Sequence, residues 1–483
     1  MSLPRHALPE PDVLAGLPPV REIPADEVAA RITGGPRLVV LDDDPTGTQT
    51  VADVPVLTAW TVDDLRWALR QDSSAFFVLT NTRSLSPADA AERNRQVVRA
   101  LHEASAAEGV PYVIASRGDS TLRGHFPLET DVLAEELTAV GAGAPDGVVV
   151  VPAYIEAGRL TVGSMHWMRT AEGLLPVGES EFARDATFGY RASALPDWVE
   201  EKTAGRVTAG EVLRITLDDL RTSGPAHVAA LLGTLRDGAT AVVDAVCDDD
   251  LRVLALALAE AEDKGAKLLY RVGPSFVRAR AGQSGRPPLT SAQLRPLRGD
   301  APHGLIVVGS HVSLTTRQLD RLRERQSGHG NLAEYELDVA QLLDDARRDN
   351  HIREIAAAAA TALETSEAVI RTTRAVVTGA DADTSLAISR SVSAALVEAV
   401  RLVNAARRPA FVIAKGGITS SDTATHGLEI RRAWARGTLL PGIVSLWQPA
   451  DGPAAGIPYI VFAGNVGDDD ALADALDLLR SAA

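Results

Sequence analysis

Three consecutive carboxylates, Asp42, Asp43 and Asp44, follow directly after an apolar run in the segment LVVLDDDPTGTQT (residues 38–50). A short apolar run such as 38–41 is typical of a strand in a parallel sheet, and ligands of open α/β sheets bind beyond the carboxyl ends of the strands. Adjacent like charges repel one another unless a metal, a polar substrate or a shared proton relieves them. We therefore expect these acids to line a ligand site, with an ordinary Asx-capped turn as the simpler alternative.

Three further loops in the first half of the chain carry charged and hydroxyl side chains after short apolar runs. They read TNTRSLS (80–86), SRGDSTLRG (116–124) and PAYIEAGRLTVGSMH (152–166). Guanidinium groups bind carboxylates and phosphates in a forked geometry, and carboxylates and hydroxyls bind substrate hydroxyls. The candidate residues in these loops are Arg83, Arg117, Asp119, Ser120, Thr121, Arg123 and Arg159. As a set they suit a small polyhydroxy acid, whereas any single arginine could equally belong to a surface ion pair.

The second half contains three expected strand-to-helix junctions that are rich in small residues. They read GSHVSLT (309–315), KGGITSSDTA (415–424) and AGNVGDDDA (463–471). A helix start presents unpaired backbone N–H groups and the positive end of the helix dipole, so each junction could cradle a phosphate oxygen. The contributing residues would be Ser310, Ser313, Gly416, Gly417, Thr419, Ser420, Gly464 and Gly467. Three such junctions predict a polyphosphate site, although none matches the Walker loop or the dinucleotide fingerprint and each alone could be an ordinary connection.

A second acidic triplet, Asp468, Asp469 and Asp470, lies in the last of these junctions. Carboxylates in a first helical turn satisfy the same N–H groups that a phosphate would use, so we interpret Asp469 and Asp470 as helix caps. Asp468 is the member of the triplet that would approach a magnesium ion.

Short apolar runs alternate with amphipathic or alanine-rich stretches along the chain, a pattern that indicates an α/β fold. Strands are expected at 38–41, 76–80, 112–115, 148–151, 241–246, 268–270, 305–308, 375–377, 411–414 and 459–462. Residues 282–304 are dense in Gly, Pro, Ser and Arg, which is typical of a linker. We therefore predict an arm (1–26), an N-terminal sugar-acid-binding domain (27–281), a linker (282–304) and a C-terminal nucleotide-binding domain (305–483). Both domains should be α/β with largely parallel sheets that face each other across an active-site cleft.

Composition excludes several functional classes. The 483 residues carry a formal net charge of −16, which argues against a nucleic-acid partner. The single cysteine, Cys247, cannot form an internal disulfide or a cysteine-built zinc site, and this fits a reducing cytoplasm. No run of about 18 apolar residues occurs and the first residues lack a signal-peptide core, so we expect neither membrane insertion nor secretion.

The motifs as a set resemble those of the four-carbon acid sugar kinase family. They are DDPTG (43–47), NTRS (81–84), DSTLRG (119–124), PAYIEAGR (152–159), GSHVSLTTRQ (309–318), KGGITS (415–420) and GNVG (464–467). The resemblance spans residues 37–479 and rests most on DSTLRG and the paired acids before Thr46 and Gly47. It implies a kinase that uses ATP and Mg²⁺ to phosphorylate a hydroxyl of threonate, erythronate or 3-oxo-tetronate.

Carried over residue by residue, the resemblance implies two sets of contacts. Around the sugar acid it puts Asp43, Asp44, Arg83, Asp119, Ser120, Thr121, Arg123 and Arg159. Around ATP it puts Ser310, Ser313, Gly416, Gly417, Ile418, Thr419, Gly464, Asn465 and Gly467, and it identifies no protein metal ligand. Asp44 is the candidate base, with Asp119 second, because phosphoryl transfer needs one carboxylate near the attacking hydroxyl. Domain closure would exclude water, and a homodimer is expected from the family and the arm.

Two positions depart from the family pattern. His125 stands where many members have an asparagine, and Phe462 stands where many have a lysine before the GN loop. A lysine aimed at the phosphates is a point charge that Phe462 cannot replace, so we expect Lys415 or Arg317 to serve instead, or a different substrate or rate.

Two other functions are compatible with parts of the sequence. Asp42, Asp44 and Thr46 fit the DxDxT pattern of haloacid dehalogenase-like phosphatases, with Asp42 as nucleophile and Asp44 as acid/base, but DSTLRG and KGGITS would then be unexplained. A non-catalytic sensor of a sugar acid or nucleotide is the other alternative, motivated by Phe462.

Overall fold

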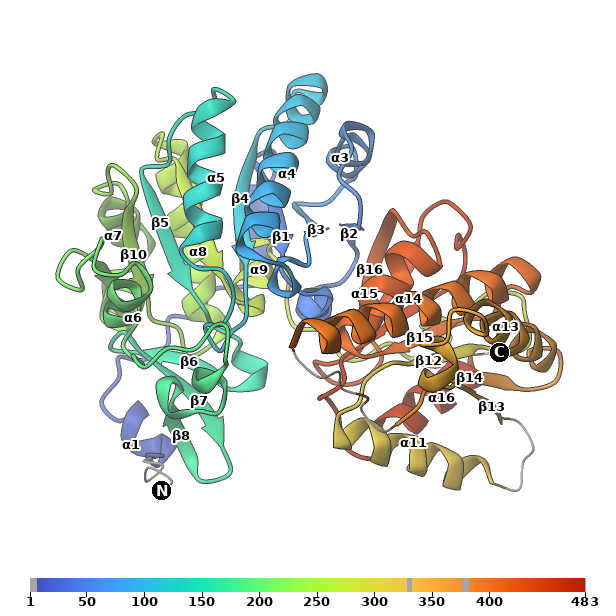
Figure 1. Cartoon of the computed structure of the whole chain (residues 1–483). Helices are drawn as coiled ribbons and strands as arrows, with labels where there is room; N and C mark the ends of the chain where they lie inside the picture. Colours follow the sequence, from blue (N-terminus) through green and yellow to red (C-terminus); the bar gives the residue numbers. More distant parts are fainter. Residues whose placement is uncertain (1–6, 328–331, 375–376, 378–381, 483) are drawn as a thin grey trace. The chain divides into compact units, whose positions relative to one another are not determined.

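The computed structural model describes residues 7–327, 332–374, 377 and 382–482 (Figure 1). The chain divides into two compact units: Met1–Val51 with Trp60–Gly285, and Ala52–Ala59 with Arg286–Ala483. Each unit is α/β and contains a largely parallel sheet, which confirms the fold class expected from the sequence.

Seven strands form the main sheet of the first unit. They are β1 (Arg37–Asp42), β3 (Ala75–Leu79), β4 (Tyr112–Arg117), β5 (Gly147–Val151), β9 (Leu213–Ile215), β10 (Ala239–Val243) and β11 (Leu268–Val272). Their order is β3-β1-β4-β11-β5-β10-β9 and every pairing is parallel. β1 is buried from Leu38 to Asp42 because both faces of a parallel sheet are covered by helices.

Most helices of the first unit belong to one of two contacting groups. Their bounds are α1 (Glu10–Leu14), α2 (Ala25–Ile32), α3 (Val62–Leu69), α4 (Pro87–Glu108), α5 (Leu128–Ala139), α6 (Leu195–Lys202), α7 (Pro225–Leu232), α8 (Asp248–Asp263) and α9 (Pro274–Arg280). α3, α4 and α5 contact one another in series, as do α7, α8, α9 and α2. Local signals set the ends of α4, since the Ser86 hydroxyl caps its start and left-handed Gly109 ends it.

A small antiparallel sheet extends the loop after β5. It consists of β6 (Arg159–Val162), β7 (Met165–Thr170) and β8 (Gly173–Pro176). The beginning of the described N-terminal arm lies against this sheet, because Leu8 pairs with Leu174 and Glu10 forms an ion pair with Arg169. The arm therefore contacts its own unit, and the homodimer stays a prediction.

The main sheet of the second unit mixes parallel and antiparallel strands. They are β2 (Val54–Leu57), β12 (Leu305–Val308), β13 (Leu332–Leu337), β14 (Glu367–Thr372), β15 (Val412–Lys415), β16 (Arg432–Thr438), β17 (Ser445–Pro449) and β18 (Tyr459–Phe462). The order is β13-β14-β12-β15-β18-β17-β16-β2, parallel as far as β18 and antiparallel beyond it. Residues 52–59, which we had assigned to the first domain, join this unit because β2 pairs with β16.

The helices of the second unit include one inside the expected linker. They are α10 (Ser291–Leu294), α11 (Ser313–Gln326), α12 (Val339–Leu342), α13 (Arg348–Ala362), α14 (Ala382–Ala406), α15 (Gly417–Asp422) and α16 (Ala471–Ser481). A capping box at Thr290 begins α10, and Leu294 packs into the core of this unit, so part of the segment 282–304 is folded. Of the strand expected at 375–377, residues 375 and 376 lie outside the described residues and Val377 is not in a strand.

Candidate functional site

The acidic motif of the first unit lies where neighbouring parallel strands end. Asp42 is in register with Leu79 of β3 and with Arg117 of β4. The loops that follow these strands therefore meet at one edge of the sheet, as the spacing of apolar runs and polar residues predicted. Asp44 then starts a short 3₁₀ helix, η1 (Pro45–Thr50).

Asp42 is enclosed rather than open to a ligand. Its side chain is 2% exposed, and Arg117 Nη1 donates to its Oδ1 at 3.0 Å. A Cβ at Gly47 would lie 1.9 Å from Asp42 Oδ2, so only glycine lets η1 cover this carboxyl. Burial raises the pKa of Asp42 to about 7 against the opposing charge of Arg117. A phosphatase nucleophile must be accessible to its substrate, so this environment disfavours the role that the DxDxT interpretation gives to Asp42.

Asp43 and Arg83 form a buried forked ion pair. Arg83 Nη2 donates to Asp43 Oδ1 at 2.5 Å and Nε donates to Oδ2 at 3.1 Å. The Arg83 backbone N–H also donates to the Asp43 carbonyl at 3.2 Å, which ties the loop after β3 to the loop after β1. Asp43 therefore orients Arg83 in this structure, and Arg83 reaches Asp44 as well, with its Nη1 3.5 Å from Oδ2.

Asp44 is the most accessible of the three acids. Its side chain is 23% exposed, and its Oδ1 accepts hydrogen bonds from the Thr46 backbone N–H at 2.9 Å and the Thr46 hydroxyl at 2.5 Å. Burial alone would raise the pKa of Asp44, but the charges of Arg83 and Arg117 and the bonds from Thr46 outweigh burial and lower it. Asp44 is therefore an ionised carboxylate with one oxygen directed by Thr46.

Asp119 is a second ionised carboxylate at this edge. Arg123 Nε donates to its Oδ2 at 2.6 Å and the Thr121 hydroxyl donates to the same oxygen. Burial opposes ionisation, but the charges of Arg83 and Arg123 hold the pKa of Asp119 well below its usual range. Of the neighbouring predicted ligands, Thr121 is 2% exposed with its hydroxyl directed at Asp119, and Ser120 is also buried.

Arg159 differs from the other arginines of the site. Within the described part of the chain it has no carboxylate partner; its Nη1 donates to the Ala157 carbonyl, and its buried Nε meets no acceptor. Burial lowers the pKa of Arg159, while the nearby charge of Asp119 opposes that shift. A cation held without a partner next to polar groups is suited to an anionic ligand.

Several residues that support the site were missed by the sequence analysis. Arg271 Nη1 donates to Glu129 Oε2 at 2.6 Å and to Ser116 Oγ at 2.8 Å, and the Thr82 hydroxyl donates to Glu129 Oε1 at 2.6 Å. A Cβ at Gly118 would lie 2.4 Å from Arg271 Nη2, so this glycine allows the loop to cross the guanidinium. Gly118 lies within a motif that the sequence singled out. Arg271 is distant along the chain and belongs to no motif, so its contact with this loop could not be predicted.

His125, one of the departures from the family pattern, has a structural role here. Its Nε2 lies 3.1 Å from the carbonyl oxygens of both Thr82 and Leu85. His125 thus joins the DSTLRG loop to the backbone on either side of Arg83. Both ring nitrogens of His166 have partners: Nδ1 lies 2.9 Å from the Thr161 hydroxyl and Nε2 lies 2.8 Å from the Ser120 carbonyl oxygen. Burial lowers the pKa of His166 to about 4.

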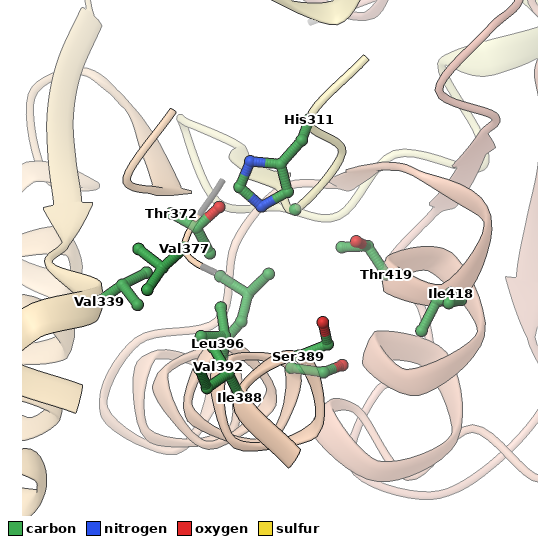
Figure 2. Close-up of a pocket in the computed structure, with 12 residues that line it drawn as sticks. His311, Val339, Thr372, Val377, Ile388, Ser389, Val392, Leu396, Ile418 and Thr419 are labelled. Atoms are coloured by element: carbon green, nitrogen blue, oxygen red, sulfur yellow. The ribbon is translucent and has the colours of Figure 1, made fainter. Parts of the chain in front are cut away.

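The second unit contains a pocket of about 210 Å³ at the carboxyl ends of β12, β14 and β15. Figure 2 shows its walls, in which a few polar side chains stand among mostly aliphatic ones. The lining residues are Gly309, His311, Val339, Thr372, Val377, Ile388, Ser389, Val392, Ser393, Leu396, Ile418 and Thr419. Thr372 is 1% exposed, and its hydroxyl has no partner among the described residues. A mostly apolar cavity with a few polar groups, called the apolar slot below, is typical of a site for a small molecule.

The three glycine-containing loops converge on Ser310. The Thr315 hydroxyl donates to Ser310 Oγ and to the Gly464 carbonyl, both at 3.0 Å. A Cβ at Gly416 would lie 3.3 Å from Ser310 Cβ, and one at Gly464 would lie 2.5 Å from Ser310 Oγ. Gly309 was not among the predicted site residues. A Cβ at this position would lie 2.2 Å from Thr419 Oγ1, so the close contact between the two loops requires a glycine.

Two helix starts at this convergence have no side-chain cap. Val312 precedes α11 and Gly416 precedes α15, and neither position contributes a capping hydrogen bond. Among the predicted nucleotide ligands, Ser313, Asn465 and Gly467 are exposed on these loops, Gly417 starts α15, and Ile418 is 61% exposed beside the pocket. The starts of α11 and α15 therefore present backbone N–H groups that no N-cap side chain satisfies, in loops that border the pocket.

The acidic triplet and the proposed replacement cations are placed differently from our expectation. Asp469 pairs with Arg317 at 2.8 Å, and Asp470 pairs with Arg325 at 2.9 Å, so these acids bind α11 rather than cap α16. Lys415 is fully buried, donates to the Ala463 carbonyl at 2.6 Å and lies 3.8 Å above the Phe462 ring. Burial lowers the pKa of Lys415 to about 7. Neither Lys415 nor Arg317 is therefore free to bind a phosphate in this structure.

The described part of the chain contains no cluster of three or more His, Cys, Asp or Glu side chains that could hold a metal ion. None of its helices combines the length and apolar character that crossing a membrane requires.

Both halves of the chain match known protein families. A family described as a sugar-binding N-terminal domain matches residues 38–280, and one described as a nucleotide-binding C-terminal domain matches residues 305–472. The chain belongs to the four-carbon acid sugar kinase family. It is 28% identical over 460 residues to a D-threonate kinase of Bordetella bronchiseptica, covering 92% of this chain and 98% of that protein.

Two solved structures share the fold. A protein of Salmonella typhimurium LT2 matches with a TM-score of 0.63 at 19% identity, covering 91% of this chain and 98% of that one. A Haemophilus influenzae protein from a family of unknown function matches with a TM-score of 0.61 at 20% identity, covering 91% and 100%. At these identities the two structures show that the fold is shared.

Proposed function

We propose that this chain is an ATP-dependent kinase that phosphorylates a hydroxyl of a small sugar acid. The expected substrates are four-carbon acids such as threonate, erythronate or 3-oxo-tetronate, or a close relative. Family membership and the similarity to a D-threonate kinase support a sugar-acid kinase, and the geometry of the two sites supports the more specific assignment.

The observation that carries the proposal is the environment of Arg159. Its guanidinium has no carboxylate partner among the described residues, yet it lies close enough to interact with Asp119. A substrate carboxylate would neutralise Arg159, while Asp119 and Asp44 would accept hydrogen bonds from substrate hydroxyls. This combination suits a hydroxylated anion. A neutral sugar would leave the charge of Arg159 without a counter-ion.

The second unit supplies what a nucleotide requires. The aliphatic slot lined by Val339, Leu396 and Ile418 suits a purine ring, and Gly309 and Thr419 connect this slot to the glycine-containing loops. The uncapped starts of α11 and α15 would donate to phosphate oxygens. We therefore assign ATP to this unit and the sugar acid to the first unit.

In the proposed reaction the substrate hydroxyl oxygen attacks the γ-phosphorus, and the bond to the β,γ-bridging oxygen breaks to release ADP. The hydroxyl proton passes to the Asp44 carboxylate, which is ionised and partly exposed. Because its pKa is lowered, Asp44 is a weak base and would take the proton late, after the oxygen has begun to bond to phosphorus, as a loose transition state allows. Transfer requires the two reacting atoms to come within about 3–3.5 Å of each other.

Magnesium fits this scheme as a companion of the nucleotide. Mg²⁺ binds phosphate oxygens with only one or two protein carboxylates, so a protein-built metal cluster is not required. Asp468 is exposed in the GN loop and forms no ion pair among the described residues. Its Oδ1 accepts a hydrogen bond from the Asp470 backbone N–H at 3.1 Å, which leaves Oδ2 as the oxygen that would approach the ion. When bound, Mg²⁺ would neutralise developing charge on the phosphates.

The experiment that tests the proposal is an ADP-release screen over four- to six-carbon aldonic and oxo-aldonic acids with ATP and Mg²⁺. We expect turnover of at least one four-carbon acid. The proposal fails if no acid turns over and ATP does not bind. Ligand-dependent thermal stabilisation without ADP release would instead favour a sensor, and phosphate release from sugar phosphates without ATP would favour a phosphatase.

A further inference from the structure

A triphosphate bound at the glycine-containing loops needs a positive charge, and the obvious candidates are already occupied. Backbone N–H groups and hydroxyls carry only partial charges, whereas ATP brings several negative charges to the site. Lys415 is buried against Phe462 and the Ala463 carbonyl, and Arg317 is paired with Asp469. Besides the Mg²⁺ that accompanies the nucleotide, a protein cation close to Ser310, where the loops converge, would stabilise the phosphates.

Arg374 is such a cation, two residues beyond the end of β14. Its Nη1 donates to the Ser310 carbonyl, and its Nη2 donates to the Thr316 hydroxyl at 2.9 Å. Its backbone carbonyl lies 3.4 Å from Nδ1 of His311, a residue that lines the pocket. The guanidinium therefore sits on the loop that joins the apolar slot to the glycine-containing turns.

The charge of Arg374 is not balanced by a carboxylate among the described residues. Its neighbours differ in this respect: Arg371 pairs with Glu334 and Glu336, and Arg323 pairs with Asp320 and Glu334. Arg374 has only neutral acceptors, and its buried Nε–H meets none in the described part of the chain. Burial and the charges of Arg371 and Arg323 lower the pKa of Arg374, and the charge of Asp320 only partly opposes that shift. The charged form of Arg374 is therefore destabilised in the free protein, and a bound anion would stabilise it.

We infer that Arg374 binds the phosphates of the nucleotide and is a specificity-determining cation of the second unit. The inference rests on the proposed function, and it concerns a residue that no motif of the sequence singled out. The competing explanation is that Arg374 only braces the Ser310 loop. Under that explanation a substitution would weaken binding of every nucleotide or nucleoside equally.

The test compares ligands that share a base but differ in charge. Calorimetric affinities for ATP, ADP and adenosine are measured for the wild type and for Arg374→Ala, Arg374→Gln and Arg374→Lys. A charge-assisted contact to phosphate predicts at least a tenfold loss of ATP and ADP affinity, about the worth of one hydrogen bond to a charged group, in the first two variants. Adenosine affinity should change less than about twofold by the same reasoning, and Arg374→Lys should restore part of the loss.

Arg401→Ala is the matched control, because Arg401 is an exposed arginine of the same unit that pairs with Glu398. Equal losses for ADP and adenosine, or no loss for either, would overturn the inference while leaving the kinase proposal intact. Failure of the wild type to bind any of the three ligands would overturn the proposed function itself. If Arg374→Ala does not fold, the ADP-to-adenosine affinity ratio in Arg374→Gln decides in the same way.

Discussion

Arg159→Met should weaken binding of the sugar acid while leaving the stability of the free protein unchanged or higher. The two measurements together therefore distinguish a binding role of Arg159 from a structural one. In the free protein Arg159 has no carboxylate partner among the described residues, and burial opposes its charge. Replacing a buried, unpaired charge with an apolar side chain of similar length is neutral or stabilising, so we expect the free energy of unfolding to stay constant or rise by up to about 2 kcal/mol. For domains of this size, 1 kcal/mol corresponds to about 2–4 °C in Tm.

The same change should weaken binding of the sugar acid. A hydrogen bond to a charged group contributes about 1.5–3 kcal/mol, which corresponds to a rise of roughly 10- to 150-fold in KM for the acid. KM for ATP should be unchanged because Arg159 belongs to the first unit. The assay is steady-state ADP release with the acid and ATP varied separately, together with thermal unfolding of the ligand-free protein.

A matched control is available on the neighbouring strand. Arg169 of β7 forms an exposed ion pair with Glu10, and surface pairs contribute about 0–1 kcal/mol, so Arg169→Met should change neither KM nor Tm appreciably. A fall of several degrees in Tm with an unchanged KM for Arg159→Met would refute the reasoning, since it would make Arg159 a structural residue.

Three further outcomes follow from the local environments. Asp44→Asn should lower kcat by about 10²- to 10⁴-fold with little change in KM for ATP, and an unchanged kcat in ADP release would exclude Asp44 as the base. Lys415 has a pKa lowered to about 7 from 10.5, so the folded state binds fewer protons and stability should rise as pH increases from about 7 to 10.5. Lys415→Met should flatten that pH dependence of Tm, and an identical profile in wild type and variant would contradict a largely neutral lysine. Thr372→Val removes a buried hydroxyl without a described partner, so the ligand-free protein should gain about 1 kcal/mol of stability; a loss measured by chemical denaturation would show that the hydroxyl is satisfied.

Local patterns were sufficient to locate the loops of the candidate site. The apolar run before Asp42 predicted a buried strand, and β1 spans Arg37–Asp42 with the acids at its carboxyl end. The strand at 305–308 was also expected, and β12 occupies Leu305–Val308 ahead of the Ser310 loop. Strand periodicity and turn composition are properties of neighbouring residues, so they can be read without knowing the rest of the fold.

Pairings between distant segments could not be predicted in the same way. Residues 52–59 join the second unit because β2 pairs with β16, a strand almost four hundred positions later in the chain. Arg117, which lies 75 residues further along the chain, donates a hydrogen bond to the buried Asp42. Asp44, two positions after Asp42, remains partly exposed. Nothing in the run of three aspartates distinguishes these environments.

The sequence by itself determined which residue types stand at the ends of the strands and at the starts of the helices, because these depend on local periodicity and capping. Only the tertiary structure decided which of those charges are already neutralised. It pairs Arg83 with Asp43 and Arg317 with Asp469, and it leaves Arg159 and Arg374 without a described carboxylate. The physical reason is that an ion pair depends on the separation of two side chains in space, which sequence distance does not specify.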